Sequence, residues 1–245
     1  AKTVRDGDRI FCGSGSSAPA ALLDAIFDRA EELHGVQVAG LIMLAPMYRI
    51  LNQEMMKHIQ FDNCYATVLD RKALQEGISV HTPFHFSEIP RLAGEYGGYT
   101  KVFTQVSPMD EHGYMSAGVS GNFLDTFKWV DELILEVNEH QPRINGMNFY
   151  HISDPRVKCV TENNAPVVAL PPDPITEVDR IIAREIAGYI KDGDTIQLGI
   201  GALPNAIGEC LMEKNDLGCY TEMIPDAIMK LAQAGVITNA RKSYF

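Results

Sequence analysis

The sequence has few of the features that mark nucleic-acid-binding, membrane-spanning or secreted proteins. Its 245 residues contain 21 Lys and Arg against 32 Asp and Glu, so the net charge is −11 and the basic excess that neutralises phosphates is missing. No apolar run approaches the ~20 residues that span a bilayer. The first residues show no basic segment followed by an apolar one, which is the pattern of a secretory signal. An anionic ligand would therefore have to be held by local features.

Cysteine is also scarce, and its distribution excludes two kinds of site. The five cysteines are an odd number and form no Cys-x-x-Cys pair, which argues against a disulfide framework and a structural zinc site. We therefore expect a protein of the reducing cytoplasm, in which each cysteine is a small buried hydrophobic residue. These cysteines are Cys12, Cys64, Cys159, Cys210 and Cys219.

A strand, a tight loop and a helix are predicted at the start of the chain. Arg9–Cys12 has the pattern of a strand end, and a loop of small residues follows it. Pro19 suits a first helical turn, and apolar residues then recur at helical spacing from Leu22 to Leu33, with Gly35 as the expected cap. The alternation along the chain predicts an α/β protein with a mainly parallel sheet. The further predicted strands are Val36–Leu44, Ala66–Leu69, Val102–Val106, Leu133–Val137 and Val167–Leu170.

Prolines mark a boundary between two predicted domains. Three of them fall within residues 171–174, where they stop a helix and remove N–H donors from a strand. After them, Thr176 with Asp179 three residues later predicts a capped helix. We therefore expect a first domain over residues 1–172 and a second domain over residues 176–245.

The chain contains two copies of one short pattern. Residues 4–21 and 190–206 share, in the same order, Asp-Gly-Asp, an isoleucine, Gly-x-Gly and Pro-x-Ala. In each copy Asp-Gly predicts a turn into a strand, the strand ends at Gly-x-Gly, and the proline begins a helix. A copy of the first domain would run to roughly a hundred residues or more. We therefore expect that the second domain is incomplete in this chain.

The glycine loop of the second copy is a candidate binding site for an anion or an oxyanion. It runs over Gly199–Pro204, between an apolar strand at Thr195–Leu198 and a helix. Such loops direct unpaired backbone N–H groups at a ligand, and the helix N-terminus adds a partial positive charge. A sharp turn without any ligand has the same pattern, and the third glycine of a dinucleotide-binding fingerprint is missing. The residues alone leave both interpretations open.

Glu222 is a candidate catalytic carboxylate. It lies in Gly218–Pro225, a short β-like stretch that runs into a predicted helix near Pro225. The carboxyl ends of strands in an α/β sheet are where ligands bind. An acidic residue before a helix can also serve only to stabilise the helix N-terminus. The position of Glu222 does not by itself decide between these interpretations.

Two further polar clusters are poor candidates for catalysis. His81, His85 and Glu88 could share a metal ion on a helix, but Pro83 interrupts that helix and no further ligand is suitably spaced. Ser107–Tyr114 contains Ser, Asp and His within one turn-like segment, whereas a hydrolase triad is assembled from separate segments. We therefore expect neither a metal site nor a triad.

Several segments carry a resemblance to a known family. The most specific are residues 190–211, with Gly-Ile-Gly-Ala-Leu-Pro, and residues 217–242, with Thr-Glu-Met. Residues 85–95, 106–120 and 137–149 support them. In collinear order over essentially the whole chain, the sequence resembles the acetyl-CoA hydrolase/transferase family, and within it the 4-hydroxybutyrate and butyrate-type CoA-transferases.

The resemblance implies a fold and a set of site residues. The fold is α/β, with two related open α/β domains of the CoA-transferase type, the second incomplete. Glu222 matches the nucleophilic glutamate of the family, and Gln197 resembles a polar active-site position. Gly15 stands where relatives often carry His-Gly-Gly, so no histidine role carries over. The loop that holds CoA and supplies oxyanion N–H donors is matched by Gly199, Ile200, Gly201, Ala202 and Leu203.

The implied reaction moves CoA between a short-chain acyl-CoA (4-hydroxybutyryl-, butyryl- or acetyl-CoA) and a free carboxylic acid. Glu222 becomes a glutamyl-CoA thioester in a ping-pong sequence. CoA is then a substrate, no bound cofactor or metal is expected, and the expected assembly is a cytoplasmic homodimer that binds neither nucleic acid nor membrane. Two alternatives stay open, an acyl-CoA hydrolase on the same fold and a truncated, non-catalytic CoA-binding module.

Overall fold

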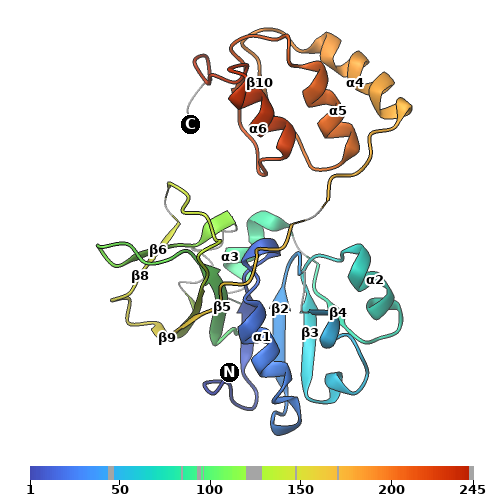
Figure 1. The fold of residues 1–245 in the computed structure, drawn as a ribbon. Coiled ribbons are helices and arrows are strands. Elements are labelled where there is room, and N and C mark those ends of the chain that lie inside the picture. Colours follow the sequence, from blue (N-terminus) through green and yellow to red (C-terminus); the bar gives the residue numbers. More distant parts are fainter. Residues whose placement is uncertain are drawn as a thin grey trace. The chain divides into compact units, whose positions relative to one another are not determined.

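The chain divides into two compact units, residues 1–169 and 170–245, and each is described by itself. The computed structural model (Figure 1) describes residues 1–43, 47–83, 85–92, 95, 97–119, 129–146, 148–169 and 171–242. Within these ranges, no helix combines the length and the apolar character needed to pass through a membrane.

The first unit is built on a parallel sheet of seven strands (Figure 1). The strands lie in the order β4-β3-β2-β1-β5-β7-β9, and every neighbouring pair is parallel. This arrangement confirms the predicted α/β class with a mainly parallel sheet. The strands are β1 (Arg9–Cys12), β2 (Val36–Gly40), β3 (Ile59–Asn63), β4 (Val80–His81), β5 (Lys101–Val106), β7 (Glu132–Val137) and β9 (Val157–Glu162).

Short helices and one antiparallel ribbon complete the described part of the first unit. The α-helices are α1 (Ala20–Phe27), α2 (Val68–Gln75) and α3 (Ile89–Leu92), and the ribbon pairs β6 (Tyr114–Ser116) with β8 (Phe149–His151). Single turns of 3₁₀ helix are η1 (Gly15–Ser17), η2 (Ala30–Glu32), η3 (Met47–Arg49), η4 (Met55–Lys57) and η5 (Phe86–Glu88).

Two hydrophobic clusters cover opposite faces of the large sheet, because successive residues of a strand point to opposite faces. On β1, Ile10 and Cys12 belong to the cluster that contains the apolar residues of α1, whereas Phe11 belongs to the other cluster. All six residues of the central strand β5 are buried. A parallel sheet that is covered on both faces requires such continuous burial.

Two predicted strands are wrong. Thr67, which lies within the predicted strand Ala66–Leu69, is the N-cap of α2 and donates its hydroxyl to the Asp70 carboxylate at 2.5 Å. The Thr-x-x-Asp cap favours a helix here more strongly than the short apolar run favours a strand. The nearest strand, β3, ends before this segment.

The second wrong prediction is the strand Val167–Leu170. Residues 167–169 form no strand, and Leu170 lies outside the described residues. The strand that pairs with β7 is β9, which lies earlier in the chain.

Two elements are shorter than predicted. The strand β2 ends at Gly40, whereas the prediction continued to Leu44, which lies outside the described residues. The helix α1 ends at Phe27, although Leu33 is still buried. The apolar spacing therefore indicated burial correctly beyond the point where the helix ends. The chain turns at Gly35, whose φ of +65° suits glycine.

The second unit starts with a helix and continues with two strand–helix pairs. The helix α4 (Glu177–Tyr189) buries Ala183 and Ala187. The elements that follow are β10 (Thr195–Ile196), α5 (Ala202–Cys210), β11 (Gly218–Cys219) and α6 (Asp226–Gln233). The strands β10 and β11 are parallel neighbours.

The Asp-Gly-Asp turn has the same geometry in both units. Gly7 and Gly193 have φ angles of 76° and 88°. The carboxylate of the second aspartate, Asp8 or Asp194, accepts the backbone N–H three residues earlier at 2.8 or 2.7 Å. In each unit the strand after this turn pairs in parallel with the next strand of its sheet. This match supports the prediction that the second unit repeats the first.

Replacing Thr176 by Ala is expected to lower the free energy of unfolding of the second unit by about 1 kcal/mol. The Thr176 hydroxyl accepts the Asp179 N–H at 3.2 Å, and the Asp179 carboxylate accepts the Thr176 N–H at 2.8 Å, which confirms the predicted cap of α4. Urea unfolding of Thr176→Ala beside Thr176→Ser, which keeps the hydroxyl, measures the effect. Equal stability of the two variants would contradict it.

Candidate active site

The glycine loop and Glu222 follow neighbouring parallel strands of the second unit. Thr195 pairs with Gly218, and Ile196 pairs with Cys219. Because these strands run in the same direction, the chain leaves both of them at the same edge of the sheet. The structure therefore brings the two candidate segments to one sheet edge.

The glycine loop leads directly into α5 and leaves donors at its N-terminus. Gly201 is the N-cap of α5 with φ 121° and ψ 179°, a backbone conformation that is essentially restricted to glycine. No side chain caps this helix, and its first turn contains no acidic residue. Within the described residues, the N–H groups of Gly199, Ile200 and Gly201 donate to no protein acceptor. The loop thus presents backbone donors beside the positive end of a helix dipole.

Thr221 connects the two segments. Its hydroxyl lies 3.2 Å from the carbonyl oxygen of Leu198, which precedes the glycine loop, and 2.8 Å from the carbonyl oxygen of Met223. The N–H of Tyr220 also donates to the carbonyl oxygen of Ile196 at 3.0 Å. The segment that carries Glu222 is therefore fixed to the end of β10. Thr221 is not among the site residues predicted from the sequence, although a threonine before a turn commonly forms a hydrogen bond with nearby backbone.

The side chains of Glu222 and Gln197 are both exposed. β10 ends at Ile196, so Gln197 belongs to the loop and not to the strand that was predicted to contain it. It lies between two buried residues, Ile196 and Leu198. Both polar residues are therefore accessible to a ligand that approaches the second unit from solvent.

A groove with a volume of about 620 Å³ lies beside the segment that carries Glu222. Thr221 and Ile224, which flank Glu222, both line it, together with Ile228 and Met229 of α6. Lys242 is a further lining residue, and its ammonium lies 5.1 Å from the centre of the Tyr220 ring. The groove offers apolar walls with one cation.

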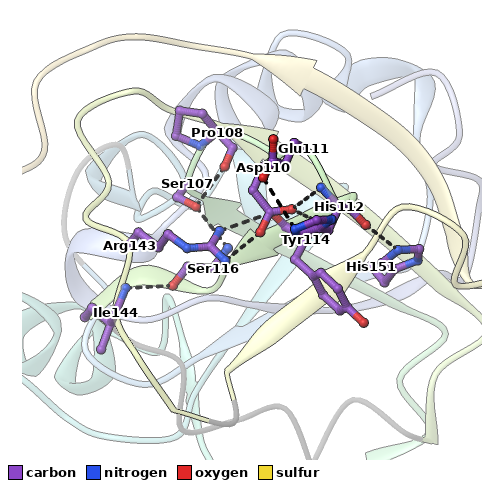
Figure 2. A network of polar contacts seen from close by, with 10 residues as sticks. All are labelled: Ser107, Pro108, Asp110, Glu111, His112, Tyr114, Ser116, Arg143, Ile144 and His151. Carbon is purple, nitrogen blue, oxygen red and sulfur yellow. Dashed lines mark hydrogen bonds and ion pairs between the residues drawn. The ribbon is translucent and has the colours of Figure 1, made fainter.

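The candidate triad of the first unit does not assemble (Figure 2). The Asp110 carboxylate accepts the N–H of Tyr114 at 2.8 Å and pairs with Arg143 at 2.6 Å. These contacts hold the pKa of Asp110 below its usual range, and the hydrogen bond from the Tyr114 N–H is the largest cause. The Ser107 hydroxyl accepts the Ser116 N–H at 2.9 Å, and the His112 side chain is exposed. The segment is a turn that Asp110 stabilises.

The histidines and cysteines singled out from the sequence are likewise dispersed. Nδ1 of His81 lies 2.6 Å from the Asn63 carbonyl oxygen, whereas the His85 N–H donates to Glu88 at 3.2 Å. No group of three metal-ligating side chains occurs among the described residues. The prediction of five buried cysteines is wrong for three of them, since only two are buried, and burial raises the pKa of Cys64 to about 12. The partly exposed ones are Cys159, Cys210 and Cys219.

Fold and site together describe an α/β protein whose second unit presents a carboxylate and a loop of backbone donors at one sheet edge. The sequence profile described as acetyl-CoA hydrolase/transferase N-terminal domain matches residues 1–172. The chain belongs to this family.

Named relatives match nearly the whole chain. The butyryl-CoA:acetate CoA-transferase of Anaerostipes caccae is 36% identical over 250 residues, covering 99% of this chain and 56% of the relative. RipA of Yersinia pestis has a similar structure, with a TM-score of 0.93 and 30% identity over 98% of this chain and 58% of RipA. A 4-hydroxybutyrate CoA-transferase of Porphyromonas gingivalis matches with a TM-score of 0.81 and 29% identity, covering 99% of this chain and 57% of that protein. The chain spans about half the length of the curated relatives it matches.

Proposed function

We propose that the protein transfers CoA between a short-chain acyl-CoA and a free carboxylate, with Glu222 as the nucleophile. The observation that carries this proposal is the pairing of β10 with β11, which places the glycine loop and the Glu222 segment at one sheet edge. A nucleophile and oxyanion donors must lie together in acyl transfer. Relatives named as CoA-transferases, at about one-third identity over almost the whole chain, support the proposal.

In the first half of the reaction Glu222 takes up CoA. A carboxylate oxygen of Glu222 attacks the thioester carbonyl, the carbon–sulfur bond breaks, and CoA leaves as a thiolate. The product is a mixed anhydride between Glu222 and the acyl group. The thiolate then attacks the glutamyl carbonyl of this anhydride, which releases the first carboxylate and leaves a glutamyl-CoA thioester.

In the second half these steps run in reverse with the incoming acid. Its carboxylate attacks the glutamyl-CoA thioester, and the thiolate leaves and attacks the acyl carbonyl of the new anhydride. A new acyl-CoA forms, and Glu222 returns as a carboxylate. Every step is an acyl transfer, so no substrate is oxidised or reduced, and the glutamyl-CoA thioester conserves the energy of the original thioester.

The glycine loop serves both halves in this proposal. Each attack passes through a tetrahedral oxyanion, which backbone N–H groups at Gly199–Leu203 would stabilise. Gln197 would supply a further polar contact, and the groove beside Ile224 would hold an apolar part of the substrate. Coenzyme A is the shared substrate, and no metal takes part.

The proposal also covers the domains of the protein, its assembly and its location in the cell. Residues 1–172 would form the first CoA-transferase domain, and residues 176–245 would begin the second, homologous one. We further propose a homodimer in the cytoplasm that acts on acyl-CoA and short-chain carboxylates and binds neither nucleic acid nor membrane.

One assay distinguishes the proposed reaction from its alternatives. The protein as the cell produces it is mixed with butyryl-CoA, with and without acetate, and both free CoA and acetyl-CoA are followed. Transfer predicts acetyl-CoA formation that requires acetate, with ping-pong kinetics. Release of free CoA in the absence of acetate would indicate a hydrolase. Binding of butyryl-CoA without any turnover would indicate a non-catalytic binding module.

Thr221→Val is expected to lower kcat for transfer about fivefold, because it removes the hydroxyl that joins the Glu222 segment to the carbonyl of Leu198. Loss of one such hydrogen bond corresponds to about 1 kcal/mol. Thr221→Ser keeps the hydroxyl and should retain most of the activity. The expectation is contradicted when the Val and Ser variants have equal kcat.

A further inference from the structure

Glu136 of β7 is a fully buried acidic residue with no charged partner among the described residues, and its relative exposure is 0%. Its carboxylate accepts three hydrogen bonds, all at 2.9 Å. The donors are the backbone N–H of Leu22 and the side-chain amides of Gln105 and Asn163. A buried carboxylate is tolerated when donors of this kind surround it. These three donors come from α1, from β5 and from the segment after β9.

The carboxylate lies at the N-terminus of α1. Leu22 is the third residue of this helix, whose N-cap is Pro19 and whose first turn contains no acidic residue. The N-terminus of a helix attracts anions through its free N–H groups and its dipole. Glu136 supplies that anion from a strand 114 residues away from Leu22 in the sequence.

The hydrogen bonds of Glu136 continue into the loop between β1 and α1. The side-chain Oε1 of Gln105 accepts the side-chain N–H of Gln141 at 2.9 Å, and the same amide of Gln141 donates to the backbone carbonyl oxygen of Ser16 at 2.5 Å. The loop at Ser16 and the first turn of α1 at Leu22 are therefore joined by one network of hydrogen bonds.

We infer that Glu136 is a built-in ligand, which fills the anion-binding position at the start of α1 in the first copy of the repeated pattern. The position accepts a carboxylate held by Leu22, Gln105 and Asn163. This inference does not depend on the transfer reaction, since it concerns the first unit alone.

Removing the built-in carboxylate tests the inference. Glu136→Ala is expected to lower Tm by about 10 °C, because three buried donors lose their acceptor. Acetate then raises the Tm of this variant in a saturable manner, whereas acetamide, which has a similar shape and no charge, does not. Hydrogen exchange of the peptide that contains Leu22 speeds up in the variant and slows again with acetate.

Controls make the outcome decisive. Wild type and Glu139→Ala, which removes an exposed glutamate two residues after β7, should show no acetate-specific rise in Tm. Equal effects of acetate and acetamide on Glu136→Ala would overturn the inference. If the Ala variant fails to fold, the Tm of Glu136→Gln tests the inference instead, because glutamine retains the shape of the side chain and lacks its charge. A Tm equal to that of wild type in the Gln variant would show that no anion is needed.

Discussion

Replacing Glu222 by Ala abolishes CoA transfer, with a fall in kcat of about 10⁴-fold or more, if this carboxylate is the nucleophile. The fold should be unaffected. Glu222 is exposed, and stability changes at such positions are usually within about 0.5 kcal/mol. The measurement is the exchange of CoA between butyryl-CoA and acetate, together with a thermal unfolding curve of the same preparation.

Glu213→Ala is the matched control for this variant. Glu213 is also an exposed glutamate of the second unit, but it follows α5 and is not in the segment after β11. Its replacement should leave both transfer and Tm unchanged. Appreciable transfer by a folded Glu222→Ala variant would remove Glu222 from the mechanism, whatever the control shows.

Replacing Gly201 by Ala is expected to lower both stability and transfer. With φ at 121° and ψ at 179°, Gly201 holds a conformation that costs a residue with a side chain about 1–3 kcal/mol. Relief of this strain would turn the backbone N–H groups away from the position they have at the start of α5. Loss of one oxyanion donor lowers kcat by about 10²–10³-fold, so we expect a fall of about 10²-fold in transfer.

Gly199→Ala is the matched control, because it adds a methyl group to the same loop without backbone strain. A Cβ added at Gly199 meets no atom within 4 Å, and its φ lies outside the region reserved for glycine. Its Tm should therefore match that of wild type, while the Tm of Gly201→Ala falls by several degrees. Equal Tm values for the two variants would contradict the role assigned to the Gly201 backbone.

The sequence predicts from local signals that the glycine loop and the Glu222 segment each follow a strand, and the structure shows that these two strands are parallel neighbours. Short motifs are enough for this prediction, because the glycines, the following proline and the Thr-Glu-Met stretch each lie next to a strand end. The parallel pairing that joins them follows from the alternation of strands and helices. Thr67 shows the opposite case, since a single capping contact turned a predicted strand into the start of a helix.

The buried network around Glu136 could not be predicted in the same way. The stretch Leu133–Val137 is recognisable as a strand, but its glutamate is satisfied by residues that lie 27 to 114 positions away. Such partners become neighbours only after the sheet has formed. The one available signal was an acidic residue within an otherwise apolar strand, because a strand buried on both faces has no exposed position for it.

Detection of the covalent intermediate tests the central claim most directly. The protein as the cell produces it is incubated with butyryl-CoA without an acceptor acid, quenched, digested and analysed by mass spectrometry. The account predicts CoA attached to the peptide that contains Glu222, and conversion of that glutamate to an alcohol when borohydride is added. An unmodified Glu222 peptide from protein that is actively transferring CoA, or CoA attached to another residue, would contradict it.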